Sequence, residues 1–150
     1  MSLWLAALGF CASAHSRSPN GSVETPTARE VLSELSRRSQ LPEEELVRLT
    51  ADCAASQQSM YFCAYRDLVS ADLALRRVMA DKGRQFPTCQ PAMDAGIHRW
   101  EVKRDKTCAR RAAREWRGGS MEPTARNLCL AASTGTMARQ MERMSACPRR

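Results

Sequence analysis

The chain has 150 residues, seven of them cysteine, and a formal net charge of +7. This length suggests one domain, and the positive charge favours acidic partners or anionic surfaces. Beyond the N-terminal region no apolar run approaches about 18 residues, which excludes a transmembrane helix in the mature chain.

The N-terminal residues have the pattern of an export signal. Residues 1–14 are uncharged and contain a short apolar run, then Ala12-Ser13-Ala14, a small-x-small pattern typical of signal-peptide cleavage. We therefore expect a signal peptide over 1–14 and a periplasmic or secreted protein; a buried N-terminal helix is the alternative. A lipid anchor on Cys11 is disfavoured because bulky Phe10 precedes it. Polar, aperiodic residues 15–26 predict a flexible linker.

Residues 27–150 predict a single helical domain. Thr27 and Glu30 form a capping-box pattern that opens a helix through about Arg38. Pro42, followed by three glutamates, suits the first turn of a second short helix.

Three longer helical patterns follow. Apolar residues recur at three- and four-residue steps over residues 57–81, and a break at residues 83–91 separates this helix from one over 92–116. Gly118-Gly119 ends that helix, and Ser120 and Pro123 start the last one. Its expected inner residues are Leu128, Cys129, Ala132, Thr136 and Met144. Without any strand pattern, we predict an all-α fold: an antiparallel three-helix core, cross-linked by disulfides, with one or two short N-terminal helices.

Six cysteines remain after the expected signal peptide: Cys53, Cys63, Cys89, Cys108, Cys129 and Cys147. An even set in an exported chain implies disulfides. Zinc is excluded by the spacing, because there is no C-x-x-C pair and only two histidines.

Symmetry about the two helix breaks constrains the pairing. Cys89 and Cys147 lie at equal distances from the Gly-Gly turn and are expected to pair. The other four can pair as 63–108 with 53–129, or as 108–129 with 53–63. We favour the first, because residues ten apart on one helix are about 15 Å apart, too far for a bridge.

A basic stripe is predicted on the second long helix. Its residues recur at steps of three and four, which places them on one face. This face is either solvated or binds an anionic envelope lipid or polymer; nucleic acid is disfavoured because disulfides and export put the protein in another compartment. The stripe consists of Arg99, Lys103, Lys106, Arg110, Arg114 and Arg117.

The chain offers little for catalysis. With two histidines, no nucleophile–base arrangement can be built, and we expect no enzymatic activity, metal or cofactor. Glu101 and Asp105 are spaced as a ligand pair, but the neighbouring cations favour a solvated charge network. Trp100, Thr107 and Cys108 are expected to face inward; for Trp100, the alternative is an aromatic binding residue.

An ordered set of motifs lies between residues 52 and 144. After Cys53 come Gln-x-x-Met-x-x-Cys-Ala, Ala-Asp-x-x-Leu, Trp-x-x-x-Arg-Asp-x-x-Cys, Gly-Gly-Ser-x-x-Pro, a further Cys and Thr-x-x-Arg. This set resembles the N-terminal domain of LprI-type lysozyme inhibitors, an exported bacterial family. Two positions depart from it: Tyr61 replaces an asparagine and Lys103 an aromatic. The remaining matches are Gln57, Met60, Cys63, Ala64, Ala71, Asp72, Leu75, Trp100, Arg104, Asp105, Cys108, Gly118, Gly119, Ser120, Pro123, Cys129, Thr136 and Arg139.

The resemblance implies inhibition of lysozyme or a related muramidase in the bacterial envelope, and it makes Cys89–Cys147 a bridge beyond the family's four cysteines. Because vertebrate c-type lysozymes are basic, a chain of charge +7 would meet long-range repulsion. Local insertion of residues 114–120 between the catalytic carboxylates of a glycosidase remains open, as does an ordinary helix–helix turn. A structural role with an unknown protein partner is the third class of function.

Overall fold

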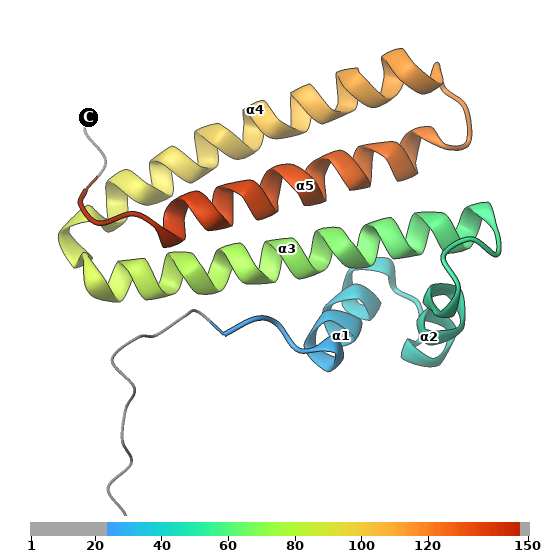
Figure 1. Cartoon of the computed structure of the whole chain (residues 1–150), viewed down its shortest axis with the longest axis horizontal. Helices are drawn as coiled ribbons and strands as arrows, with labels where there is room; N and C mark the ends of the chain where they lie inside the picture. Colours follow the sequence, from blue (N-terminus) through green and yellow to red (C-terminus); the bar gives the residue numbers. More distant parts are fainter. Residues whose placement is uncertain (1–23, 148–150) are drawn as a thin grey trace, which may run out of the picture.

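The computed structural model describes residues 24–147, and the expected signal peptide, Cys11 and most of the expected linker lie outside this range. Within it the chain is helical, with no strand, as predicted (Figure 1). The elements are α1 (Ala28–Ser39), α2 (Glu43–Ala51), α3 (Gln57–Gln85), the 3₁₀ turn η1 (Pro87–Cys89), α4 (Gln90–Trp116) and α5 (Glu122–Glu142). None of the helices in this range is long and apolar enough to cross a membrane.

The helix starts follow local signals in the sequence. Thr27 accepts a hydrogen bond from the backbone N–H of Glu30, whose carboxylate accepts one from the N–H of Thr27, so the predicted capping box is present. The hydroxyl of Ser56 caps α3 in the same way. Pro42 is the residue before α2 and not its first residue. The break between α3 and α4 is shorter than the predicted residues 83–91, because both helices extend into it.

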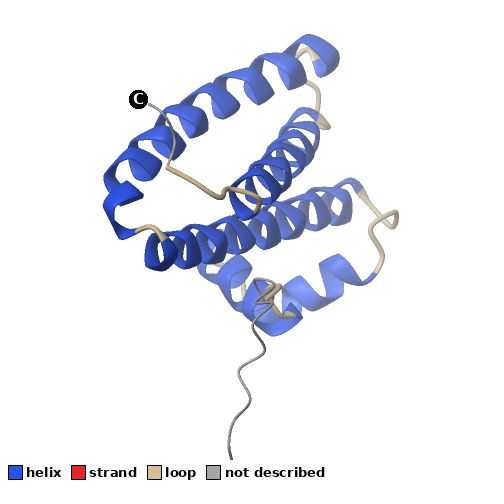
Figure 2. Cartoon of the chain, turned by 60° about the vertical axis from the view of Figure 1, so that its left-hand side comes forward, coloured by secondary structure: helices blue, strands red, loops and turns tan. Residues whose placement is uncertain are grey.

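The helices are arranged with α5 between α3 and α4. Helix α4 runs antiparallel to both α3 and α5, so α3 and α5 run parallel to each other, and α1 and α2 cover the other side of α3 (Figure 1). Figure 2 shows α4 standing apart from α3 while α5 lies along it. The burial agrees: α3 buries nine residues, whereas the almost equally long α4 buries only Met93, Cys108 and Ala112. Helix α4 is therefore attached to the body mainly through α5.

Two apolar clusters use opposite sides of α3. Val69 packs with the apolar residues of α1 and α2, including the fully buried Leu35 and Leu46. The neighbouring Leu68 packs with Cys108 and Leu130 on the side of α4 and α5. Helix α3 is thus the central element of the domain.

The predicted inner face of α5 is wrong for three of its five residues, whereas Cys129 and Met144 are half-buried. Its buried residues are Thr124, Leu130, Thr134 and Ala138, whereas Leu128, Ala132 and Thr136 are exposed. Residues two positions apart on a helix point in nearly opposite directions, so Leu128 and Leu130 cannot both face α3. The sequence alone offers two apolar faces, and packing on α3 selects the one with Leu130.

Three disulfides join Cys53 to Cys63, Cys89 to Cys147, and Cys108 to Cys129. The expected 89–147 pair is confirmed, and the favoured pairs 63–108 and 53–129 are wrong. Cys53 lies in a turn before α3, where Ala54 donates its N–H to the Asp52 side chain. Because the chain folds back there, the Cα atoms of Cys53 and Cys63 are only 5.8 Å apart. Cys53 therefore does not lie on the helix that carries Cys63, and the separation of about 15 Å expected for one helix does not hold for this pair.

Candidate functional site

The turn between α4 and α5 forms the tip of a helical hairpin. Arg117 ends α4 in the left-handed conformation (φ 45°), and Gly118 follows at φ 79°. A side chain at Gly119 would lie 2.9 Å from the carbonyl oxygen of Trp116, so the turn requires glycine there too. The side chain of Arg117 is exposed, and that of the adjacent Trp116 is 39% exposed. The turn thus presents a cation beside an accessible aromatic ring.

Hydrogen bonds brace this tip. The backbone N–H of Gly118 donates to the Glu122 carboxylate at 2.7 Å, and the Gln57 side-chain amide donates to the Ser120 hydroxyl at 2.6 Å. The second bond joins the tip to the start of α3 and brings together two motif positions 63 residues apart. Further along the hairpin, the Cys108–Cys129 bridge links α4 to α5. The tip is therefore preorganised.

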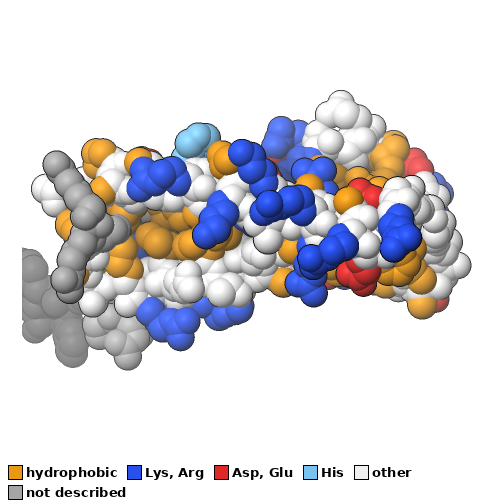
Figure 3. Space-filling view, turned by 90° about the horizontal axis from the view of Figure 1, so that it is seen from above, with side chains coloured by type: hydrophobic (Ala, Val, Ile, Leu, Met, Phe, Trp, Pro, Cys, Tyr) orange, Lys and Arg blue, Asp and Glu red, His pale blue; other side chains and the backbone are white. Residues whose placement is uncertain are grey.

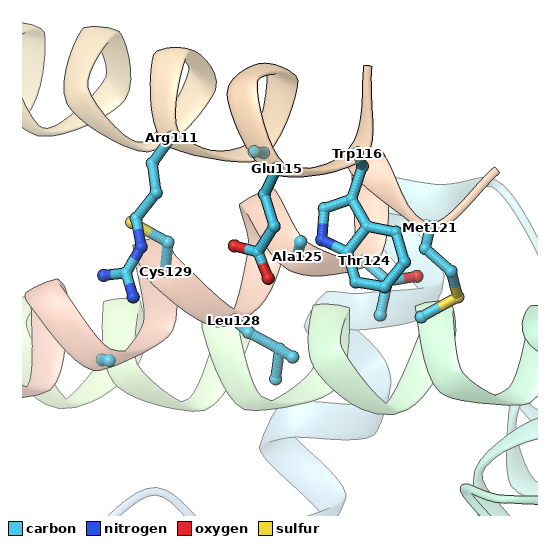
Figure 4. Close-up of a pocket in the computed structure, with 10 residues that line it drawn as sticks. Arg111, Glu115, Trp116, Met121, Thr124, Ala125, Leu128 and Cys129 are labelled. Carbon is cyan, nitrogen blue, oxygen red and sulfur yellow. The ribbon is translucent and has the colours of Figure 1, made fainter. Parts of the chain in front are cut away.

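An apolar groove lies beside the tip, between α4 and α5. Trp116 and Glu115 point from α4 toward Leu128 of α5, and Met121 lies at the end near the turn (Figure 4). The cavity volume is about 340 Å³. Leu128 is 50% exposed, because α4 does not cover this face of α5. The side chain that the sequence assigned to the core thus lines a surface groove.

The basic stripe is on the outer face of α4, as its spacing predicts. All six side chains are exposed, and none forms a salt bridge with another residue between 24 and 147. Figure 3 shows the lysine and arginine side chains along this face, with few carboxylates among them. The six residues are Arg99, Lys103, Lys106, Arg110, Arg114 and Arg117.

A second set of motif residues forms a polar network between four helices. Asp72 of α3 accepts a hydrogen bond from Arg38 of α1 at 2.7 Å and lies 3.7 Å from Arg104 of α4. Arg104 donates to the Thr134 hydroxyl of α5 at 2.7 Å and stacks 5.0 Å from the Trp100 ring centre. Asp72 and Arg104 thus connect all three long helices.

Two ionisable groups at the α1 side of this network, Glu34 and Arg38, have pKa values shifted toward their charged forms. The hydrogen bonds from Arg37 and, to a smaller extent, the one from Arg38 lower the pKa of Glu34 to about 2. Burial by itself would lower the pKa of Arg38, but its hydrogen bonds to Asp72 and Glu34 outweigh this effect and raise it. The network therefore joins α1, α3, α4 and α5 through ion pairs and hydrogen bonds, which is a structural role.

Met60 and Arg139 lie outside the tip and the polar network, whereas Asp105 lies at the edge of the network beside Arg104. Met60 is 36% exposed, and the Arg139 guanidinium donates to the Thr136 hydroxyl on the same helix. Asp105 accepts a hydrogen bond from Arg104 at 2.8 Å, as expected for a charge network. Thr107 is exposed, so its predicted inward orientation is wrong.

Three network residues were not found from the sequence: Glu34, Arg38 and Thr134. For Glu34 and Arg38, the sequence contains one indication of a role. They are four residues apart on one helix and Glu34 is next to the buried Leu35, so they form a charged pair at the edge of an apolar face. Nothing in the sequence shows that Asp72 is their partner. Between residues 24 and 147 no cluster of three histidine, cysteine or acidic side chains could hold a metal ion.

Comparison with known protein families gives a match over the central and C-terminal helices. The family described as Lysozyme inhibitor LprI matches residues 50–141, more than half of the chain. No curated protein and no solved structure gives a match. The disulfides and this match together indicate an exported protein, and the family is one of inhibitors, not of enzymes. The chain therefore belongs to the LprI lysozyme-inhibitor family.

Proposed function

We propose that this protein inhibits a lysozyme or a related muramidase in the bacterial envelope, and that the tip of the α4–α5 hairpin enters the enzyme's cleft. Family membership supports the class of target. The observation that carries the choice of surface is the braced tip, which holds an exposed arginine next to an accessible tryptophan.

The chemistry of the tip suits a glycosidase cleft. Such clefts contain a pair of carboxyl groups, and a guanidinium can bind a carboxylate through two parallel hydrogen bonds. Arg117 supplies that group, and Trp116 adds apolar contact area at little cost in side-chain entropy. Because the turn is already braced by Gly118–Glu122 and Gln57–Ser120, little backbone order has to be gained on binding.

The charge of the chain limits how inhibition can work. A net charge of +7 slows encounter with a basic lysozyme, so a tight complex with such an enzyme has to come from slow dissociation. A muramidase with an acidic cleft rim would be attracted by the same charge. The proposed inhibitor therefore relies on local contacts at the tip, and its preferred target carries negative charge around the cleft.

A turbidity assay tests the proposal. Lysozyme is mixed with excess purified, oxidised protein, and the clearing of a bacterial suspension is followed over time. We expect slower clearing with the natural chain and at least tenfold weaker inhibition with Arg117→Gln, because the group that binds the carboxylates is lost.

Arg99→Gln is the matched control. It removes the same charge from the same helix, about 27 Å from the tip, and should inhibit like the natural chain. Unchanged clearing with the natural chain, for both a basic and an acidic muramidase, would exclude the inhibitor function. Equal loss in both variants would instead exclude the tip as the contact surface.

A further inference from the structure

The outer face of α4 has a charge pattern that neither the packing nor the proposed inhibitor tip explains. At 100° per residue, the six cations of the stripe fall within an arc of about 80°. The four acidic residues of the helix, Asp94, Glu101, Asp105 and Glu115, fall on the opposite half. A surface that served only solubility would mix the two signs of charge.

Two arginines of α4 differ in whether they contact the rest of the domain. Arg104 points to the body, where it is 11% exposed and contacts Asp72, Asp105 and Thr134. Arg110, one of the stripe residues, points outward and has no salt-bridge partner in the described part of the chain. Between residues 24 and 147 the stripe cations thus form no salt bridge that would hold the helix in place.

From this arrangement we propose that α4 is a docking ridge for the surface of an anionic phospholipid bilayer. The stripe runs from Arg99 to Arg117, about 27 Å along the most outlying helix of the domain (Figures 2 and 3). Negatively charged lipid headgroups attract such clusters of lysine and arginine, and the attraction acts within a Debye length of the surface.

The shape of the surface favours a bilayer over a single polyanionic strand. Proteins that bind single-stranded nucleic acids use a positively charged groove with aromatic side chains along it. Here the cations stand on a convex ridge, and the two tryptophans of α4 lie elsewhere: Trp100 stacks on Arg104, and Trp116 points into the groove toward α5 (Figure 4). A ridge without walls can contact a flat layer of headgroups along its whole length.

Vesicle sedimentation tests this proposal. The natural chain should bind vesicles that contain phosphatidylglycerol and should not bind vesicles of phosphatidylcholine alone. Binding should fall at least tenfold between low salt and about 0.5 M salt, because screening weakens contacts between exposed charges. The variant K106Q/R110Q/R114Q removes half of the stripe and should bind at least tenfold more weakly at low salt.

A control variant with the same loss of charge distinguishes the effect of the stripe from the effect of the net charge of the protein. R29Q/R48Q/R126Q removes three exposed arginines from α1, α2 and α5. It should bind vesicles almost like the natural chain. Equal weakening in both triple variants would overturn the proposal, as would equal binding to both kinds of vesicle.

Two further measurements close the test. The first is retention on heparin. If the natural chain is retained in a way that depends on the stripe but does not bind vesicles, the ligand is a soluble polyanion and the proposal of bilayer binding is overturned. A blue shift of Trp116 fluorescence on vesicles, compared with W116F, would place lipid in the groove and overturn contact by the ridge. Since Arg117 is unchanged in K106Q/R110Q/R114Q, this variant should keep the inhibition proposed for the tip, so the two proposals can fail separately.

Discussion

Helices α3 and α4 have almost the same length, but they are held in the domain in different ways. Helix α3 packs on both sides, against α1 and α2 and against α5, and it supplies most of the buried residues. Helix α4 packs mainly on α5 and is further held by the Cys108–Cys129 bridge, by the Cys89–Cys147 bridge just before its start and by Arg104. Burial holds the first helix in place, and covalent and ionic links hold the second. Because the outer face of α4 is not needed for packing, it can carry a row of charged side chains.

The largest expected effect comes from removing a disulfide of α4. In the chain-entropy model, losing Cys108–Cys129, with a separation of 21 residues, costs about 3 kcal/mol of unfolding free energy. We expect C108A/C129A to unfold at lower denaturant concentration and its α4 amides to exchange faster, while those of α3 stay protected. C53A/C63A is the control, because it should not increase exchange in α4. Equal exchange in α3 and α4 would contradict the comparison.

A smaller effect is expected at the polar network. Asp72→Asn removes the charge that faces Arg38 and Arg104, which are 16% and 11% exposed. Leaving two cations without their carboxylate should lower the unfolding free energy by about 2 kcal/mol, measured by chemical denaturation. Asp67→Asn breaks an exposed pair with Arg66 and should cost less than about 0.5 kcal/mol. Similar losses in the two variants would mean that the network does not join the helices.

The smallest expected effect is on the stability of the protein at acidic pH. The pKa of Glu34 falls from 4.5 to about 2 in the folded protein, because of its hydrogen bonds to Arg37 and Arg38. Between these values the unfolded chain binds more protons, so this contribution to stability is complete above about pH 4.5 and is lost as the pH falls toward 2. Denaturation curves of Glu34→Gln at several pH values should show a weaker pH dependence in this window than those of the natural chain. An unchanged slope would contradict the role of Glu34.

Local features were predictable because they depend on neighbouring residues. The capping box of Thr27 and Glu30, the glycine turn at 118–119 and the basic stripe all follow from spacing along the chain. The inner face of α5 was not predictable, because Leu128 and Leu130 are equally apolar and only the position of α3 and α4 distinguishes them. The path of Cys53 depended on the turn before α3, which helical periodicity does not describe.

By itself, the sequence determined the helices, their order, the even set of six cysteines in the described chain and the family, since each is encoded in spacing and residue type. The tertiary structure decided which cysteines pair and which side of α5 is buried. It also joined Asp72 to both Arg38 and Arg104, and Gln57 to Ser120. The last three contacts connect residues 32 to 63 positions apart on different elements, and only the packed chain brings these residues within hydrogen-bonding or ionic reach.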